Sequence, residues 1–210
     1  MTANKFEGKF ITFEGVEGAG KTTNIEFIAK KFQEKGLDIL LTREPGGTII
    51  GEAIRDILIS KDLPEMHHTT ELLLMFAARA EHINRKIIPA LEQGKWVLCD
   101  RFTDASYAYQ GAGRGIDFNN IKTLEKLVQN KLRPDYTFLF DLDANVGLAR
   151  AKRRGETDRF EQQDIDFFNR VRAQYLKMAK SDKSRYCIIN AQYDIETVQQ
   201  QIFSILNDLY

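Results

Sequence analysis

The stretch that decides the fold is Gly15-Val-Glu-Gly-Ala-Gly-Lys-Thr-Thr23, which contains the pattern Gly-x₄-Gly-Lys-Thr. It follows an apolar, β-rich run at residues 9–14 and precedes a helical run at residues 22–35. The glycines let the backbone curl so that successive N–H groups point at phosphate oxygens, next to the positive end of a helix. The motif and its strand–loop–helix context therefore predict a site for the phosphates of a nucleotide.

Every residue of this loop is a candidate for contact with ATP. These candidates are Gly15, Val16, Glu17, Gly18, Ala19, Gly20, Lys21, Thr22 and Thr23. Lys21 is also a candidate catalytic residue, because the lysine of this motif reaches the β- and γ-phosphates. The Thr22 hydroxyl is a candidate Mg²⁺ ligand, so ATP with Mg²⁺ is the expected partner. The motif alone does not separate a kinase from a GTPase or a motor ATPase.

Outward from the loop, short apolar runs alternate with longer helical ones. Strands are predicted at residues 9–14, 38–42, 95–100, 136–142 and 185–190. Helices are predicted at residues 22–35, 47–59, 69–93, 119–131, 145–154, 161–180 and 194–209. Strands that are apolar on both faces and separated by helices favour right-handed crossovers and a parallel sheet. The expected fold is one α/β domain over residues 1–210, with a five-stranded parallel sheet and helices on both faces.

Composition narrows the class of protein. Thirty basic residues balance thirty acidic ones, which argues against a protein that coats nucleic acid. No apolar stretch approaches the roughly 18 residues needed to span a bilayer, and the first residues lack the apolar segment of a secretory signal. Cys99 and Cys187 lie in apolar runs and are expected to be reduced core residues. We expect a cytoplasmic protein that binds neither nucleic acid nor membranes.

Asp100 ends the third predicted strand, and Arg101 follows it directly. A carboxylate at the carboxyl end of a strand beside a phosphate loop organises Mg²⁺ and its waters, so Asp100 is the second candidate metal ligand. Arg101 is a candidate to clamp a phosphate group bidentately; the alternative is a solvent-exposed Asp–Arg pair. The chain contains neither Asp-x-x-Gly nor Asn-Lys-x-Asp, which argues against a GTPase.

Five blocks, of which the first contains the phosphate loop, follow one another along the chain. They are Phe13-Glu-Gly-Val-Glu-Gly-Ala-Gly-Lys-Thr-Thr23, Thr42-Arg-Glu-Pro-Gly-Gly-Thr48, Met75-Phe-Ala-Ala-Arg-Ala-Glu-His82, Asp100-Arg-Phe-Thr-Asp-Ala-Ser-Tyr-Ala-Tyr-Gln-Gly111 and Arg153-Arg-Gly-Glu-Thr-Asp-Arg-Phe160. With these blocks the chain resembles the thymidylate (dTMP) kinase family, of the bacterial type. The resemblance implies the P-loop nucleoside-monophosphate-kinase fold and direct in-line transfer of the γ-phosphoryl group from Mg²⁺-ATP to dTMP, which yields dTDP for dTTP biosynthesis. Family members are usually homodimers, and the predicted helix at residues 69–93 is the candidate interface.

The resemblance also assigns roles in dTMP binding. Phe76 would stack on thymine and Arg79 would donate to its O4, although helical spacing alone favours core packing for Phe76. Ser106 and Gln110 would hold the pyrimidine. Tyr109 would lie under the sugar and leave no space for a ribose 2′-hydroxyl. The alternative for these last three residues is an ordinary helix with one exposed polar face.

Other acceptor contacts fall near the phosphates. Arg101 would bind the phosphate of dTMP, and Arg43, Glu44 and Pro45 would line the acceptor side. Glu17 would accept a hydrogen bond from the 3′-hydroxyl of dTMP. Its charge would otherwise repel the phosphates of ATP, at a cost on the order of 1 kcal/mol. The alternative for Glu17 is a solvent-facing position in a turn.

The segment Arg150-Ala-Lys-Arg-Arg-Gly-Glu-Thr-Asp-Arg159 has five basic residues in ten, which composition alone would assign to a solvated helix end. In the bacterial type of the family, a short mobile lid around residues 150–160 supplies the cation that the phosphate loop lacks. Arg154 is the first catalytic candidate, Arg153 the second, and Arg159 a further one. Asn190 and Ala191 lie near the place expected for adenine.

Two alternatives remain open at this point. One is a kinase that acts on another small acceptor, such as dUMP, a different monophosphate or a non-nucleotide. The other is a regulatory module or ATPase that has a phosphate loop and no acceptor site. The blocks after the second and third predicted strands argue against the latter.

Overall fold

The computed structural model describes residues 6–155 and 159–207. Five strands pair in parallel in one sheet of order β2-β3-β1-β4-β5. They are β1 (Phe10–Glu14), β2 (Ile39–Arg43), β3 (Trp96–Asp100), β4 (Tyr136–Asp141) and β5 (Tyr186–Asn190). Each strand lies within one or two residues of its predicted position, and the predicted fold class is confirmed.

The sheet is most deeply buried at its centre. Every residue of β1 is buried, and Phe13 stacks on Phe138 of β4 with ring centroids 5.5 Å apart. Continuous apolar runs are typical of such central parallel strands, because helices cover both of their faces. The outer strands are less covered: Leu41 on β2 is 44% exposed and Ile188 on β5 is 49% exposed.

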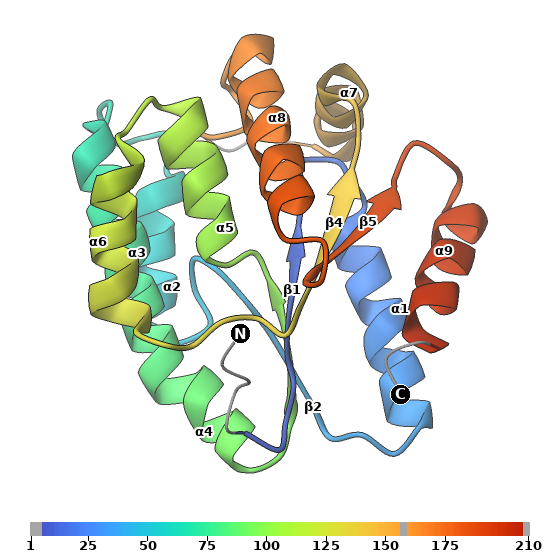
Figure 1. Cartoon of the computed structure of the whole chain (residues 1–210). Coiled ribbons are helices and arrows are strands. Elements are labelled where there is room, and N and C mark those ends of the chain that lie inside the picture. The colour runs from blue at the N-terminus through green and yellow to red at the C-terminus, as the bar shows by residue number, and fades with distance from the viewer. Residues whose placement is uncertain (1–5, 156–158, 208–210) are drawn as a thin grey trace.

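Helices flank the sheet on both sides (Figure 1), with α1 and α9 on one side and α2, α3, α5 and α6 on the other. Their bounds are α1 (Lys21–Glu34), α2 (Ile49–Ile59), α3 (His68–His82), α4 (Ile88–Glu92), α5 (Thr103–Ser106), α6 (Phe118–Gln129), α7 (Ala144–Arg154), α8 (Ile165–Ser181) and α9 (Ile195–Asn207). Two π-helical segments, η1 (Ile83–Ile87) and η2 (Tyr107–Gly113), continue α3 and α5. In the part of the chain that the structure describes, no helix is long and apolar enough to cross a membrane.

The helices differ from the predicted ones at three places. The helix predicted at residues 69–93 is interrupted by the π-helical turn η1. The helix predicted to begin at residue 161 begins at Ile165, where the Asp164 side chain accepts a hydrogen bond from the Phe167 amide at 2.6 Å and caps it. The α5–η2 segment was not among the predicted helices; it contains two glycines and one serine, and its packing against α8 stabilises it.

The carboxyl ends of the strands define where a ligand binds. The phosphate loop follows β1, a loop with a cis Glu44–Pro45 bond follows β2, and Arg101 follows β3. In open parallel sheets, ligands bind in the crevice outside these carboxyl ends. The fold therefore gathers on one edge of the sheet the segments that the sequence singled out.

Candidate active site

The phosphate loop curls around a cavity at the amino end of α1. Gly15, Gly18 and Gly20 have φ values of 142°, 70° and 79°, which favour glycine. Helix α1 begins at Lys21, whose Nζ donates to the carbonyl oxygens of Gly15 at 3.2 Å and Val16 at 3.1 Å. The amide groups and the lysine thus form an anion-binding concavity at a helix N-terminus.

The cavity, which we call the phosphate cavity, has a volume of about 1340 Å³ with its open mouth. Its lining includes the loop residues from Glu17 to Thr23. The other lining residues lie at the ends of β2 and β3, on α2 and α7, and in the turn before α8: Arg43, Glu44, Arg55, Asp100, Arg101, Arg150 and Glu161. The expected loop, Asp100 and Arg101 therefore lie at one site.

The loop also packs closely against α7. A Cβ atom on Gly18 would lie 2.1 Å from the carbonyl oxygen of Gly147, and one on Gly147 would lie 2.5 Å from the carbonyl oxygen of Glu17. Only glycine at both positions allows this approach of backbone to backbone. The position of the phosphate loop is therefore coupled to the helix that leads into the expected lid.

Asp100 and Thr22 both line the phosphate cavity. The Oδ1 atom of Asp100 is buried and has no hydrogen-bond partner among the described residues. Within residues 6–155 and 159–207 no group of three or more His, Cys, Asp or Glu side chains is placed to hold a metal ion. One carboxylate and one hydroxyl fit Mg²⁺, which is usually held through few protein ligands together with water and substrate phosphates.

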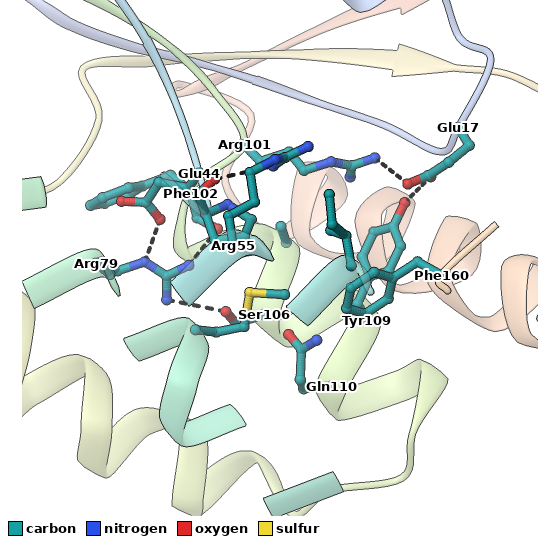
Figure 2. A pocket seen from close by; sticks show the side chains of 14 residues that line it. Glu17, Glu44, Arg55, Arg79, Arg101, Phe102, Ser106, Tyr109, Gln110 and Phe160 are labelled. Atoms are coloured by element: carbon teal, nitrogen blue, oxygen red, sulfur yellow. Dashed lines mark hydrogen bonds and ion pairs between the residues drawn. The ribbon is translucent and has the colours of Figure 1, made fainter. Parts of the chain in front are cut away.

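A second cavity, which we call the acceptor cavity, adjoins the first and has a volume of about 550 Å³ with its mouth (Figure 2). The residues that line it come from the phosphate loop, the loop after β2, helices α2 and α3, the turn after β3, the α5–η2 segment, and Phe160. They are Glu17, Glu44, Pro45, Arg55, Ile59, Met75, Arg79, Arg101, Phe102, Ala105, Ser106, Tyr109, Gln110 and Phe160. Glu17, Glu44, Arg55 and Arg101 line both cavities.

Arg101, Glu17 and Tyr109 form a cluster between the two cavities. Arg101 donates from Nη2 to Glu17 Oε1 at 2.8 Å and from Nη1 to the Gly15 carbonyl at 3.0 Å, and its guanidinium lies 4.8 Å from the centre of the Tyr109 ring. The Tyr109 hydroxyl donates to Glu17 Oε2. Burial raises the pKa of Glu17, but the charges of Arg101 and Lys21 outweigh burial and hold this pKa below its ordinary value. Glu17 is therefore a carboxylate that faces the acceptor cavity and not open solvent.

Arg101 adopts an unusual backbone conformation, with φ at 66°. Its own amide donates to the Phe13 carbonyl at 2.9 Å, and the following amide, of Phe102, donates to Glu14 Oε1 at 2.8 Å. Left-handed backbone costs a non-glycine residue roughly 1 kcal/mol, so these hydrogen bonds stabilise it. The turn points the guanidinium back across the phosphate loop.

Arg79 is fixed on three sides in the acceptor cavity. It donates from Nε to Glu44 at 2.7 Å, from Nη1 to Ser106 Oγ at 3.1 Å and from Nη2 to the Phe102 carbonyl at 3.1 Å (Figure 2). Its guanidinium lies 4.5 Å from the centre of the Phe76 ring. Each terminal nitrogen of Arg79 retains a further N–H after these bonds, which suits recognition of a carbonyl oxygen.

The expected stacking role of Phe76 is not supported. Phe76 is 2% exposed, packs with Leu72 and Ile121, and does not line the acceptor cavity. Met75 lines it instead, because residues four apart on a helix share a face and Met75 lies four before Arg79. Phe76 lies beneath the guanidinium of Arg79 and contacts the cavity only through it.

The remaining acceptor candidates lie around the same cavity. Ser106, Tyr109 and Gln110 line it from the α5–η2 segment, and Pro45 lines it from the loop after β2. Gln110 donates to Glu71 at 2.9 Å, which fixes its amide. Arg43 lines the phosphate cavity and not the acceptor cavity, and its Nη2 pairs with Glu52 at 2.9 Å.

The arginine-rich segment divides in the structure. Arg153 is exposed on α7, whereas the side chain of Arg154 and residues 156–158 lie outside the described part of the chain. Arg159 pairs with Glu71 at 2.8 Å and donates to the Leu58 carbonyl at 2.9 Å, and it lines neither cavity. These contacts argue against Arg159 as the cation that reaches the phosphates. Arg150 lines the phosphate cavity and donates to the Ala191 carbonyl at 3.0 Å.

Sequence reasoning missed two charged residues of the site. Arg55, on α2, lines both cavities and donates to the Pro45 carbonyl at 3.1 Å. Glu161, just beyond the lid segment, is 6% exposed and lines the phosphate cavity. Thr48 caps α2, and Arg55 lies seven residues later, which is two turns along the helix. Arg55 therefore lies on the same face of α2 as its start, next to the loop after β2, and this spacing was the signal available in the sequence.

A phosphate loop at the amino end of α1, a carboxylate after β3 and an adjoining cavity lined by arginines define a P-loop phosphotransferase of the nucleoside-monophosphate-kinase type. A sequence model of the family Thymidylate kinase matches residues 13–202, and the chain belongs to this family.

The similar proteins of known name are also thymidylate kinases. The chain is 53% identical to a thymidylate kinase of Pseudomonas putida (strain GB-1) over 199 residues, which are 95% of either chain. It is 50% identical to a thymidylate kinase of Teredinibacter turnerae over 93% of this chain and 95% of the relative. A crystal structure of thymidylate kinase from Ehrlichia chaffeensis superposes with a TM-score of 0.76 at 35% identity, over 95% of this chain and 98% of that one. The chain is an ATP-dependent nucleotide kinase that phosphorylates dTMP to dTDP.

Proposed function

We propose that the phosphate cavity binds ATP, that the acceptor cavity binds dTMP, and that the γ-phosphoryl group crosses where the two cavities meet. The observation that carries this proposal is that Glu17, Glu44, Arg55 and Arg101 line both cavities. Phosphoryl transfer depends on positioning and on charge neutralisation more than on a strong base, because the acceptor phosphate is already an anion. Arg101 and Arg55 bind that phosphate, and Lys21 binds the β- and γ-phosphates.

The loop residues from Gly15 to Thr23 bind ATP through their amide groups, and Thr22 and Asp100 hold Mg²⁺. The orphaned Oδ1 of Asp100 supports this assignment. When bound, the metal neutralises charge on the β- and γ-phosphates. Chelation by EDTA is expected to abolish transfer, and Asp100→Asn is expected to raise the Mg²⁺ concentration at half-maximal rate. An unchanged Mg²⁺ requirement of the D100N enzyme would contradict the assignment of Asp100 as an Mg²⁺ ligand.

Thymine binds between Met75 and the α5–η2 segment, with Arg79, Ser106 and Gln110 directed at its polar edge. The sugar lies on Tyr109, and its 3′-hydroxyl donates to Glu17. Both oxygens of the Glu17 carboxylate already accept one hydrogen bond, but each has a second lone pair for a hydroxyl donor. This arrangement resolves the electrostatic conflict between Glu17 and ATP, because Arg101 neutralises the carboxylate locally.

The lid, the dimer and the location in the cell are further parts of the proposal. Residues 150–160, of which 156–158 and the Arg154 side chain lie outside the described part of the chain, form the lid, and Arg154, or Arg153 beside it, supplies the cation that the phosphate loop lacks. The chain forms a homodimer through α2 and α3, where Ile50, Ile57 and Leu73 are exposed by 56%, 43% and 51%. A sedimentation mass of one chain would contradict the dimer. The enzyme works in the cytoplasm, where nucleotides are made.

The deciding experiment is an acceptor panel of dTMP, dUMP, dCMP, UMP and dGMP, with ADP formation measured under Mg²⁺-ATP. We expect dTMP to be the best acceptor and Lys21→Ala to remove its turnover. A better acceptor than dTMP would require a different occupant of the acceptor cavity. ATP turnover that no acceptor stimulates would favour an ATPase without an acceptor site.

A further inference from the structure

A buried histidine, His82, lies behind the acceptor cavity, in contact with Glu44 of its lining. His82 is fully buried, is the last residue of α3 and lines neither cavity. Its Nδ1 lies 3.0 Å from Glu44 Oε1, and its Nε2 lies 2.6 Å from Thr42 Oγ1. Both nitrogens of this buried imidazole therefore have a hydrogen-bond partner, as buried polar groups normally do.

The partners determine how His82 is protonated. Glu44 faces the guanidinium of Arg79 and is a carboxylate, which accepts hydrogen bonds and donates none. The Nδ1 of His82 must therefore carry a proton and donate it to Glu44. The Thr42 hydroxyl is the partner of Nε2, so both ring nitrogens of His82 are hydrogen-bonded.

Glu44 is the link between His82 and the acceptor cavity. One of its oxygens accepts from His82, and the other accepts from Arg79 Nε at 2.7 Å (Figure 2 shows this second bond). With both oxygens engaged and only 4% of the residue exposed, Glu44 cannot change its rotamer without losing a charge-assisted hydrogen bond. The position of the Arg79 guanidinium therefore depends on the hydrogen bond between His82 and Glu44.

The backbone around His82 is shaped to keep it there. Helix α3 ends at His82 and continues as the π-helical turn η1, and such turns occur frequently at functional sites. The loop after β2 folds over the ring, because a Cβ atom on Gly47 would lie 2.5 Å from His82 Nε2. The ring is therefore clamped between α3 and the loop that carries Glu44.

We propose that His82 is a positioning residue for dTMP: its Nδ1–H holds Glu44, and Glu44 holds the guanidinium of Arg79 toward the base. The inference rests on the proposed role of Arg79 in the acceptor cavity. It assigns to His82 no contact with either substrate and no part in the transfer of the phosphoryl group.

The test compares three substitutions that remove different parts of the network. His82→Asn keeps a donor near the position of Nδ1, His82→Gln keeps a polar group near Nε2 only, and His82→Leu keeps neither. Loss of a hydrogen bond to a charged group corresponds to about a tenfold change, so we expect H82Q and H82L to raise the KM for dTMP about tenfold. We expect H82N to stay within about threefold of the parent enzyme, and the KM for ATP to stay within about twofold in all three.

A matched pair separates positioning from general loss of stability. Thr42→Val removes the half-buried hydroxyl that bonds His82 Nε2, and Thr12→Val removes a fully buried hydroxyl that bonds Thr137 in the sheet at 2.9 Å. We expect T42V to raise the KM for dTMP and T12V to leave it unchanged, with the melting temperature measured for both. Equal effects of H82N and H82Q, or a parallel rise in the KM for ATP, would overturn the inference.

Arg79→Ala distinguishes failure of this inference from failure of the proposed function. If R79A leaves the KM for dTMP unchanged, the proposed acceptor site is wrong, and the role inferred for His82 fails with it. If R79A raises that KM while H82L does not, the acceptor site stands and the role of His82 is refuted. A rise in both, with rescue by H82N, supports the positioning role.

Discussion

At the scale of single residues, one helical position separates a residue that lines the acceptor cavity from a core residue. Met75 and Phe76 are neighbours on α3, yet Met75 lines the acceptor cavity and Phe76 packs with Leu72 and Ile121. A step of one residue turns a helix by about 100°, so neighbours cannot share a face. The larger side chain, which is the aromatic one, does not line the acceptor cavity.

This difference predicts opposite effects of two substitutions. Met75→Ala removes apolar surface from the acceptor cavity, worth roughly 1 kcal/mol, and we expect the KM for dTMP to rise about fivefold with a small change in melting temperature. Phe76→Leu is expected to lower the melting temperature and to change that KM less, because it alters packing beneath Arg79. Steady-state kinetics and thermal unfolding of both variants check this. If F76L raised the KM for dTMP more than M75A did, the result would support Phe76 as the residue that stacks on thymine.

At the scale of elements, the phosphate loop and α7 meet through two glycines. Alanine is normally favoured over glycine in a helix by about 1 kcal/mol, so Gly147→Ala would ordinarily stabilise α7. Here the added methyl group would lie 2.5 Å from the carbonyl oxygen of Glu17 and would push the phosphate loop away. Overpacking of this kind costs about 1–3 kcal/mol.

We therefore expect Gly147→Ala to raise the KM for ATP about fivefold or more. Gly36→Ala is the control, because Gly36 has φ at 80° and open space around it, and it lies just beyond the end of α1 that is remote from the phosphate loop. That substitution is expected to lower stability by about 1 kcal/mol and to leave the KM for ATP unchanged. An unchanged KM for ATP in G147A would show that α7 moves to accommodate the methyl group and that the phosphate loop stays in place.

At the scale of the whole molecule, a buried carboxylate couples stability to pH. Glu14 ends β1, is fully buried, and accepts hydrogen bonds from the Tyr175 hydroxyl at 2.7 Å and the Phe102 amide at 2.8 Å. Burial, with the nearby charge of Asp104, raises the pKa of Glu14 from 4.5 to about 8, although Tyr175, Arg101 and the Phe102 amide act against the rise. The folded state therefore binds a proton that the unfolded state releases above pH 4.5.

The sign of the effect follows from this proton. Between about pH 4.5 and pH 8 the folded state holds more protons, so the free energy of unfolding falls as pH rises and levels off above pH 8. The slope is on the order of 1 kcal/mol per pH unit. Glu14→Gln keeps the shape and removes the charge, so its unfolding free energy from urea titrations should fall less over this range. Parallel curves for E14Q and the parent protein would contradict the assignment.

Much of the fold was predictable because it depends on local patterns. Continuous apolar runs predicted all five strands, and the glycine pattern before Lys21 predicted the loop, the helix after it and the phosphate cavity. The α5–η2 segment was not among the predicted helices because its glycines and serine have low helix propensity, and packing against α8, α6 and α3 favours the helix. Local propensity is a weak prior, which tertiary packing overrides.

For the site, the sequence by itself determined which residues are present at the carboxyl ends of the strands: Glu17, Glu44, Asp100 and Arg101. The order of chain segments in a parallel sheet brings these ends together whatever the details of packing. Only the tertiary structure decided that Met75 and not Phe76 meets the acceptor cavity, that Arg159 pairs with Glu71, and that His82 lies behind Glu44. These outcomes depend on helix phase and on partners tens of residues away in the chain, which no local pattern contains.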